Sequence, residues 1–325
     1  MTYVRTVLGD IAPGDLGVTY AHEHLVIDGG RPVLMQPDFD LSDVERMVTE
    51  VASAADLGLG AVVDAMPCDA GRNAAKLAEI SRRTGVHVVA PTGLHHDRYY
   101  GPAHWSHRLS VDALAELFVA DIVEGIDAND YSGPVVRRTA HRAGVIKVAG
   151  TDAFPDDRDR LIFEAAVIAH VHTGAPILTH CEGGRRAVEQ LRFLVDHGVP
   201  RAHIVLSHVD KVVDRGYHRE LLSGGGVVEY DGSFRSPAGE PNGTLRLLSE
   251  MAEDGLLDGV LLGMDAARRG YYKAYGGGPG LTWLLDGFST AMDAHGLGSA
   301  QRRRLFVDNP ARAFAFVDVT SREHG

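Results

Sequence analysis

The sequence alternates short apolar runs with longer amphipathic segments along almost its whole length. The apolar runs are rich in valine, isoleucine and leucine, which is typical of parallel strands that are buried on both faces. Most segments between them carry apolar residues at the spacing of an amphipathic helix. We count eight such runs, at residues 17–25, 60–67, 87–96, 143–151, 175–182, 202–210, 225–232 and 259–265.

Eight strand–helix units in 325 residues predict an α/β fold, namely a (β/α)8 TIM barrel. A doubly wound parallel sheet is the alternative, but the number of units fits the barrel better. No stretch has the composition of a linker, so residues 1–325 are predicted to form a single domain. Residues 2–17 predict a short N-terminal β-hairpin that plugs the N-terminal end of the barrel.

Three helix boundaries can be predicted from local residues. Ser42 and Glu45 have the spacing of a capping box, so a helix is expected to begin at Ser42. A helix before Gly174 is expected to end at that glycine. Near the C-terminus, Asn309 is predicted to cap a helix that has Pro310 in its first turn.

Composition narrows the classes of function. A formal net charge of −12 argues against a nucleic-acid partner, which requires a basic surface. No apolar run is long enough to cross a membrane, and the N-terminal residues lack the apolar core of a signal peptide. The two cysteines, Cys68 and Cys181, are too few for a disulfide framework, so both are predicted to be packing residues of a cytoplasmic protein.

Several of the apolar runs end in side chains that can bind a metal ion, and in barrels of this kind the chemistry lies at the carboxyl ends of the strands. Each such residue alone has an ordinary explanation, such as a hydrogen-bonded core histidine, a helix cap or a lysine that reaches solvent. Their joint occurrence at equivalent strand ends predicts a metal site instead. The residues are His22, His24, Lys147, His180, His208 and Asp265.

Alternation along a strand predicts where these side chains point. His22 and His24 should share one face, and Glu23 between them should face the helical layer and find a polar or salt-bridge partner. His208 is expected to face inward together with Leu206. Other histidines stand among polar residues and are predicted to be solvated, namely His107, His203, His218, His295 and His324.

The motifs that carry these residues resemble the phosphotriesterase-like members of the amidohydrolase superfamily. The matching pieces are YAHEHL, VIKVAGT, ILTHCE, LSHVD, GMD and VDNPARAF, in the family's order and over nearly the whole chain. The resemblance implies a barrel enzyme with two divalent metal ions. Zinc is the first expectation, and manganese, cobalt and iron are compatible with the same ligands.

The resemblance also implies a role for each ligand. His22, His24 and Asp265 would hold the buried ion, and His180 and His208 the more exposed one. Lys147 would bridge the two as an N-carboxylated lysine, which is consistent with burial, because burial lowers a lysine pKa and leaves a neutral amine that can react with carbon dioxide. A bridging hydroxide would attack the substrate, and Asp265 would act as the catalytic proton carrier.

The loop after the eighth run indicates the substrate. Residues 266–281 combine arginines and tyrosines, which suit an anionic group such as phosphate. This loop is similar to the branch of the family that opens phosphorylated sugar lactones. By that similarity, Arg268 and Tyr271 are the predicted phosphate ligands, with Arg235 as a third, and His95 is predicted to line the pocket.

The predicted function is therefore that of a lactonase acting on a small, anionic, phosphorylated sugar lactone. A phosphotriester, phosphoester or carboxylester hydrolase with the same metals is the alternative. The sequence departs from the organophosphate-degrading members, since Gly232 stands where they have a histidine and His95 where they have an aromatic residue.

Two other classes of protein are disfavoured. A non-catalytic binding protein on the same barrel would have lost metal ligands, and every expected ligand is present. The glycine fingerprint of a nucleotide-binding sheet is missing after the first strand. A homodimer is a further expectation.

Overall fold

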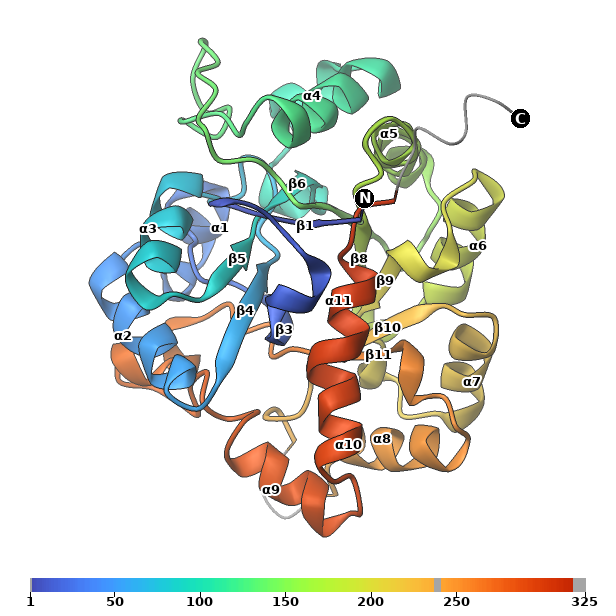
Figure 1. The fold of residues 1–325 in the computed structure, drawn as a ribbon. Helices are drawn as coiled ribbons and strands as arrows, with labels where there is room; N and C mark the ends of the chain where they lie inside the picture. The colour runs from blue at the N-terminus through green and yellow to red at the C-terminus, as the bar shows by residue number, and fades with distance from the viewer. Residues whose placement is uncertain (1, 237–240, 318–325) are drawn as a thin grey trace.

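The computed structural model describes residues 2–236 and 241–317 and has the parallel α/β barrel that the pattern predicts (Figure 1). Six strands pair in the order β11-β10-β9-β8-β7-β6 and three in the order β3-β4-β5, all of them parallel. The strands are β3 (Val18–Glu23), β4 (Leu59–Asp64), β5 (His87–Val89), β6 (Pro91–Leu94), β7 (Val145–Gly150), β8 (Ile177–Cys181), β9 (Ile204–Ser207), β10 (Val227–Tyr230) and β11 (Val260–Leu262).

Two features join these sheets into one barrel. The third predicted run is divided at Ala90 into β5, which pairs with β4, and β6, which pairs with β7. On the other side, the backbone N–H groups of Met264 and Asp265 both donate to the carbonyl oxygen of His22, at 3.3 and 2.9 Å. The segment after β11 is thereby fixed beside β3, and the eight predicted strand positions form a closed ring.

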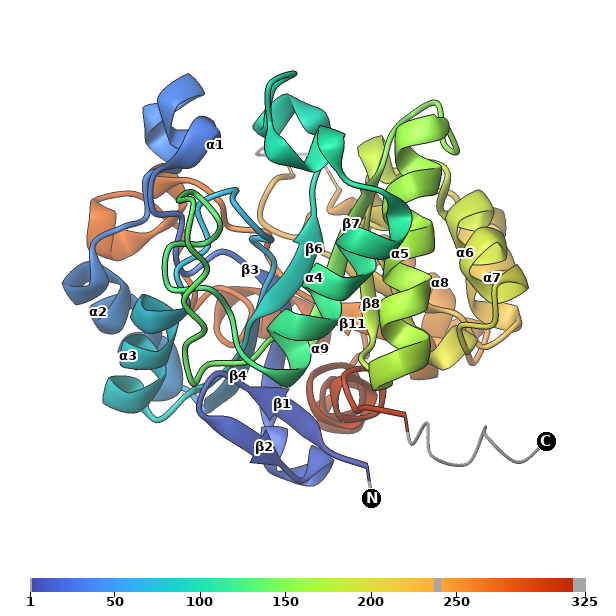
Figure 2. The same cartoon turned by 90° about the horizontal axis from the view of Figure 1, so that it is seen from above.

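The helices surround the strands, as Figure 2 shows from a second direction. None of those within the described residues is long and apolar enough to cross a lipid bilayer. The helices are α1 (Gly30–Met35), α2 (Val44–Ala55), α3 (Ala74–Thr84), α4 (Val111–Val123), α5 (Asp157–Thr173), α6 (Ala187–Asp196), α7 (Arg215–Ser223), α8 (Gly243–Glu253), α9 (Gly287–Ala294), α10 (Ser299–Arg303) and α11 (Asn309–Ala313).

One of the three predicted helix boundaries is confirmed. Gly174 ends α5 in the left-handed conformation, with φ 74°. The capping box was wrong, because Asp43 rather than Ser42 caps α2 and accepts from the N–H of Arg46. The prediction that Asn309 caps a helix was also wrong, because α10 runs through a π-helical turn into α11 without a break. The side chain of Asn309 instead donates to the carbonyl oxygens of Leu257 and Val260.

The predicted N-terminal hairpin is present. Strand β1 (Val4–Thr6) pairs antiparallel with β2 (Gly9–Ile11). In Figure 2 this hairpin and α11 lie at one end of the barrel, opposite α1. The hairpin packs against an apolar cluster inside the barrel, so the end where the strands begin is closed by a solid core.

The inner layer explains where the polar site begins. Each of five neighbouring strands contributes one apolar residue to the inner cluster, namely Val145, Leu178, Val205, Val227 and Leu261. Because alternate residues share a face, the residues two positions later also point inward, above this layer. In four of these strands they are Lys147, His180, Ser207 and Glu229.

This layer corrects one prediction. Leu206 packs in the outer cluster and Val205 in the inner one, so alternation turns Ser207 inward and not His208. His208 nevertheless reaches the site, because it follows the end of β9 and adopts a left-handed backbone with φ 68°. A non-glycine residue in this conformation is uncommon, and such residues cluster at functional sites.

Candidate metal centre

The six predicted metal ligands come together at the end of the barrel where the strands terminate. His22 and His24 lie at the end of β3, Lys147 in β7, His180 in β8, His208 just after β9 and Asp265 just after β11. They derive from five different strands, of which β7, β8 and β9 follow one another along the chain, whereas β3 and β11 lie near its two ends. The barrel topology alone makes them neighbours.

One side of the cluster is formed by His22, His24 and Asp265. The Nε2 atom of His24 lies 3.1 Å from Oδ1 of Asp265, and Nε2 of His22 lies 3.7 Å from the same oxygen. Nζ of Lys147 lies 3.5 Å from Nε2 of His22. Burial would raise the pKa of Asp265, but the hydrogen bond with His24 and the charges of its neighbours hold it well below its usual value.

The other two predicted ligands adjoin this group. The ring centroids of His180 and His208 are 4.4 Å apart, and those of His22 and His208 are 4.8 Å apart. Burial lowers the pKa of each of these three histidines, so their rings favour the neutral form that binds metals. All of the predicted metal ligands therefore belong to one cluster.

Lys147 has the environment that carboxylation requires. Its side chain is buried, and burial lowers its pKa to about 8, although neighbouring carboxylates act in the opposite direction. A neutral amine is therefore accessible near neutral pH. Its Nζ atom adjoins the proposed ligand His22, at 3.5 Å from Nε2.

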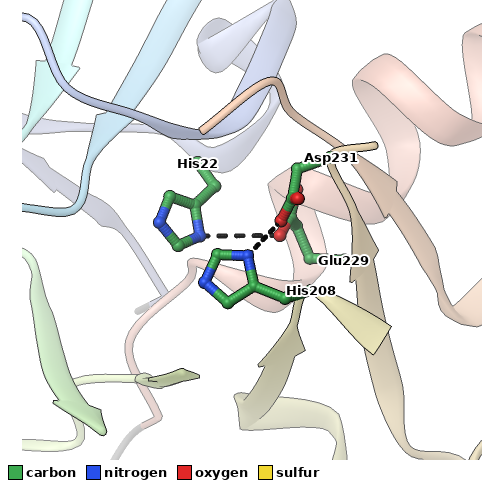
Figure 3. Close-up of side chains that lie close together, drawn as sticks. All are labelled: His22, His208, Glu229 and Asp231. Carbon is green, nitrogen blue, oxygen red and sulfur yellow. Dashed lines mark hydrogen bonds and ion pairs between the residues drawn. The ribbon is translucent and has the colours of Figure 1, made fainter. Parts of the chain in front are cut away.

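Sequence reasoning missed two carboxylates of β10 and its following residue. Figure 3 shows Glu229 and Asp231 beside the rings of His22 and His208. Asp231 pairs with Nδ1 of His208, and Oε2 of Glu229 lies 3.5 Å from Nδ1 of His22. The signal was present in the sequence, since two acidic residues at alternate positions of a buried run must point to the same face.

A third carboxylate, Glu182, was also missed. Its Oε2 atom lies 3.1 Å from Nε2 of His180 and 3.1 Å from Nε2 of His96, and Arg98 approaches it to 3.2 Å. The carboxylate thus ties the loop after β6 to the proposed ligand in β8. The hydrogen bond with His180 and the contact with His96 outweigh the effect of burial and lower the pKa of Glu182 well below its usual value.

The side chains fit a pair of divalent ions. Neutral imidazole nitrogens with one carboxylate are common ligands of zinc and related metals. Two buried imidazole atoms of the cluster, Nε2 of His208 and Nδ1 of His24, have no hydrogen-bond partner among the described residues. Because a buried polar atom is seldom left unpaired, these atoms are available to a bound ion.

A cavity of about 320 Å³ opens above the cluster. The four predicted substrate residues, Arg268, Tyr271, Arg235 and His95, all line it. The remaining lining residues are His22, His24, Ile27, Pro32, Phe39, Met66, Tyr99, His180, Lys211, Asp265 and Ala267. Lys211 was not predicted, and its exposed side chain adds a further positive charge to the wall.

The cationic residues differ in how they are held. The guanidinium of Arg268 donates to Oε1 of Gln36 at 2.9 Å and stacks on the ring of Phe39 at 4.6 Å. Arg235 instead lies against the metal cluster, with donors 2.6 Å from the carbonyl oxygen and 3.2 Å from Oδ2 of Asp265. Arg268 also lies 3.6 Å from Oδ2 of Asp38, but its side chain is 38% exposed against 27% for Arg235, so it is the more accessible of the two to a ligand.

The other histidine predictions were mixed. His107 and His295 are exposed, as predicted, and His203 is partly buried. His218 was wrong, because it is buried behind β10, where Nε2 pairs with the carbonyl of Val212 and Nδ1 with the hydroxyl of Tyr230. His324 lies outside the described residues.

The remaining predictions concern residues that are not proposed as metal ligands, namely Glu23 and the two cysteines. Glu23 is buried, and its polar partners are the backbone N–H groups of Met264 and Ala266. Both cysteines are buried and unpaired, and burial raises the pKa of the Cys181 thiol to about 12. A thiol with so high a pKa is not a nucleophile at neutral pH.

Known proteins are similar in sequence to this chain over nearly its whole length. The model of the phosphotriesterase family matches residues 2–314. A phospho-furanose lactonase of Mycoplasmopsis synoviae is 31% identical, over 97% of this chain and 92% of its own length. The phosphotriesterase homology protein of Escherichia coli is 30% identical, over 92% and 98% of the two chains.

Solved structures agree with these matches. An amidohydrolase from Mycoplasma synoviae superposes with a TM-score of 0.92 at 29% identity, covering 98% of this chain and 93% of that chain. A lactonase from Listeria monocytogenes gives a TM-score of 0.88 at 28% identity, covering 97% and 100%. The fold and site are those of a metal-dependent hydrolase of the amidohydrolase superfamily. The chain belongs to the phosphotriesterase family, a family of binuclear metal hydrolases, which confirms the resemblance found in the sequence.

Proposed function

We propose that this enzyme is a lactonase that opens a small phosphorylated sugar lactone at a centre of two divalent metal ions. The observation that carries the proposal is the cavity, which has the histidine cluster at its base and Arg268, Lys211 and Tyr271 on its wall. Two relatives of 31% and 32% identity bear the name phospho-furanose lactonase. A phosphorylated lactone presents the two groups that such a cavity suits, an ester carbonyl and a phosphate.

The proposed ligands divide into two sets. His22, His24 and Asp265 would hold one ion, and His180 and His208 the other. Lys147, carboxylated on Nζ, would bridge them, and its buried position supports this role. Zinc suits the ligand set best, although manganese, cobalt and iron are compatible with it.

Substrate binding is assigned to the wall of the cavity. A guanidinium can hold two phosphate oxygens at once, and a tyrosine hydroxyl donates a further hydrogen bond. Arg268 and Tyr271 are the primary phosphate ligands, and Lys211 supplies a second positive charge. The structure of the Escherichia coli phosphotriesterase homology protein, described as having phosphate in its active site, superposes with a TM-score of 0.84 at 29% identity, which supports an anionic ligand here.

The reaction adds water to the ring ester. When bound, the two ions would polarise the lactone carbonyl and acidify the attacking water. A bond forms between the water oxygen and the carbonyl carbon, and the ring C–O bond breaks. Asp265 takes the proton released by the water and passes it to the leaving ring oxygen, which yields a hydroxy acid.

Asp265 is held for this step by its neighbours. His24 and Arg235 contact its carboxylate at 3.1 and 3.2 Å. Arg235 therefore acts mainly through Asp265, and its contribution to phosphate binding is secondary. His95, which stacks near His180 with ring centroids 4.9 Å apart, forms the wall beside the more exposed ion position.

Two further assignments complete the proposal. The chain works in the reducing cytoplasm, which is consistent with two cysteines that are both buried and unpaired. It forms a homodimer, as barrels of this kind often do. Size-exclusion chromatography with light scattering tests the second assignment.

Metal content and substrate preference test the function together. Metal per chain is measured by elemental analysis of protein purified without chelators, and the same sample is assayed with plain sugar lactones, phosphorylated sugar lactones and a phosphotriester. Two ions per chain and the fastest opening of a phosphorylated lactone are expected. Two ions with preference for the phosphotriester or for an uncharged ester would keep the centre and overturn the substrate. A chain that binds no metal would overturn both.

A further inference from the structure

Glu229 places a carboxylate at the bottom of the cluster, behind His22. It is fully buried, and it belongs to the inward face of β10, two residues after the apolar Val227. Its Oε2 atom lies 3.5 Å from Nδ1 of His22 (Figure 3). The other ring nitrogen of His22, Nε2, is the one that lies near Lys147. The carboxylate therefore faces the rear nitrogen of a proposed metal ligand.

Stability of the fold does not explain this residue. Neither oxygen of Glu229 accepts a hydrogen bond from an N–H or hydroxyl group of the described residues, and burial and the neighbouring Asp231 raise the pKa of its carboxyl group well above the usual value. His22 Nδ1 forms its hydrogen bond with Oγ of Ser207, at 3.1 Å, so the contact with Glu229 is electrostatic. A buried carboxylate without hydrogen bonds destabilises a fold, and an uncharged side chain of the same shape would not.

The carboxylate is also held in place. A side chain at Gly263, in the segment after β11, would bring its Cβ within 2.7 Å of Oε1 of Glu229. The space that a side chain at residue 263 would need is occupied by the carboxylate of Glu229, which therefore packs directly against the backbone of Gly263. The neighbouring Asp231, from the same face, pairs with Nδ1 of His208 in the same way. Two acidic residues thus stand behind two of the proposed metal-binding rings.

We infer that Glu229 is a positioning residue of the metal centre, which, together with the hydrogen bond from Ser207, orients His22 and strengthens the binding of a divalent cation. The inference rests on the proposed metal centre. A carboxylate behind a metal-binding histidine fixes the ring and increases its basicity, and its loss typically weakens metal binding by 10–100-fold. The unfavourable burial of Glu229 is then offset only when the cation is bound.

The test compares metal affinity with the stability of the metal-free chain. Wild type and Glu229→Gln are stripped of metal and titrated with Co²⁺ alone, with binding followed by dialysis and by the visible absorption of the bound ion. We expect Glu229→Gln to bind Co²⁺ about 10–100-fold more weakly, with an altered spectrum. Its metal-free Tm should not fall, because glutamine keeps the shape of the side chain and Glu229 accepts no hydrogen bond from an N–H or hydroxyl group of the described residues.

Tyr230→Phe is the matched control, since Tyr230 lies on the opposite face of β10 and its hydroxyl contacts His218. It should lower the metal-free Tm and leave Co²⁺ binding unchanged. Equal Co²⁺ affinity in wild type and Glu229→Gln would overturn the inference while leaving the proposed function intact. A wild type that binds no metal would instead overturn the proposed function. If Glu229→Gln does not fold, Glu229→Asp replaces it, and wild-type Co²⁺ affinity in that variant would overturn the inference.

Discussion

Glu23 holds the backbone on both sides of Asp265. Its carboxylate accepts hydrogen bonds from the N–H groups of Met264, at 2.7 Å, and Ala266, at 3.2 Å. The residue between the two histidines of β3 therefore fixes the segment that carries the acidic ligand from the far end of the sequence. It contributes to the site although its own side chain does not face the cavity.

Replacing this residue should affect both stability and metal binding. In Glu23→Gln, the amide group can accept only one of the two hydrogen bonds, and the loss of the other should lower the free energy of unfolding by about 1–3 kcal/mol. Asp265 should then be less well placed, so metal content per chain should fall. Urea denaturation and elemental analysis measure the two effects. Full metal content in a destabilised variant would limit Glu23 to a structural role.

Lys147→Ala should lose metal. The alanine variant lacks the atom that would carry the bridging carboxylate, so we expect less than half of the wild-type metal, with partial recovery when acetate or formate is added. Lys211→Ala is the control, because Lys211 lines the cavity wall and should not affect metal content. Elemental analysis measures the metal content per chain of both variants, and wild-type metal content in Lys147→Ala would exclude the bridging role.

Arg268→Ala should separate phosphate recognition from catalysis. Hydrogen bonds to a charged group contribute about 1.5–3 kcal/mol, so KM for a phosphorylated lactone should rise at least about tenfold. KM for an uncharged lactone should hardly change. Arg269→Ala is the control, since Arg269 pairs with Asp40 and is not part of the cavity wall. Equal losses on the two substrates would contradict the assignment of Arg268 to phosphate.

His218 should make stability depend on pH. Burial lowers the pKa of His218 in the folded chain, although its hydrogen bond to the backbone acts in the opposite direction. The unfolded chain therefore binds the proton more readily, and the contribution of neutral His218 to stability is lost as pH falls through about 6.5. The Tm difference between metal-free wild type and His218→Gln should be larger at pH 7.5 than at pH 5.5. A difference that is the same at both values would refute the pKa shift.

Gly93→Ala should disrupt the strand beside Lys147. Gly93 has φ 102°, and a Cβ there would lie 1.9 Å from the carbonyl oxygen of Lys147. Neither strand can yield without breaking the pairing of β6 with β7, so we expect a loss of more than about 4 kcal/mol or failure to fold. Gly85→Ala is the control, because it has φ 74° but open space at Cβ, and should cost about 1 kcal/mol. Thermal denaturation of the two variants measures the contrast.

The sequence by itself determined the barrel and the identity of its metal-capable residues. The reason is that both depend on local pattern: buried parallel strands need continuous apolar runs, and strand ends can be read where those runs stop. His22, His24, Lys147, His180 and Asp265 could therefore be assigned to strand ends before their distances were known. The predicted cap at Ser42 failed for the opposite reason, since Ser42 and Asp43 are both competent caps and only the helix axis chooses between them.

Only the tertiary structure decided which side chains contact the proposed metal ligands. Alternation predicted that His208 would face inward from β9, but Ser207 does so, and His208 reaches the cluster through a left-handed turn of its backbone. Glu229 was missed because its partner His22 is distant in sequence, and Glu182, although close to His180 in the chain, also contacts the distant His96. Hydrogen bonds and ion pairs of this kind form between strands, so their geometry depends on closure of the barrel, which no single segment encodes.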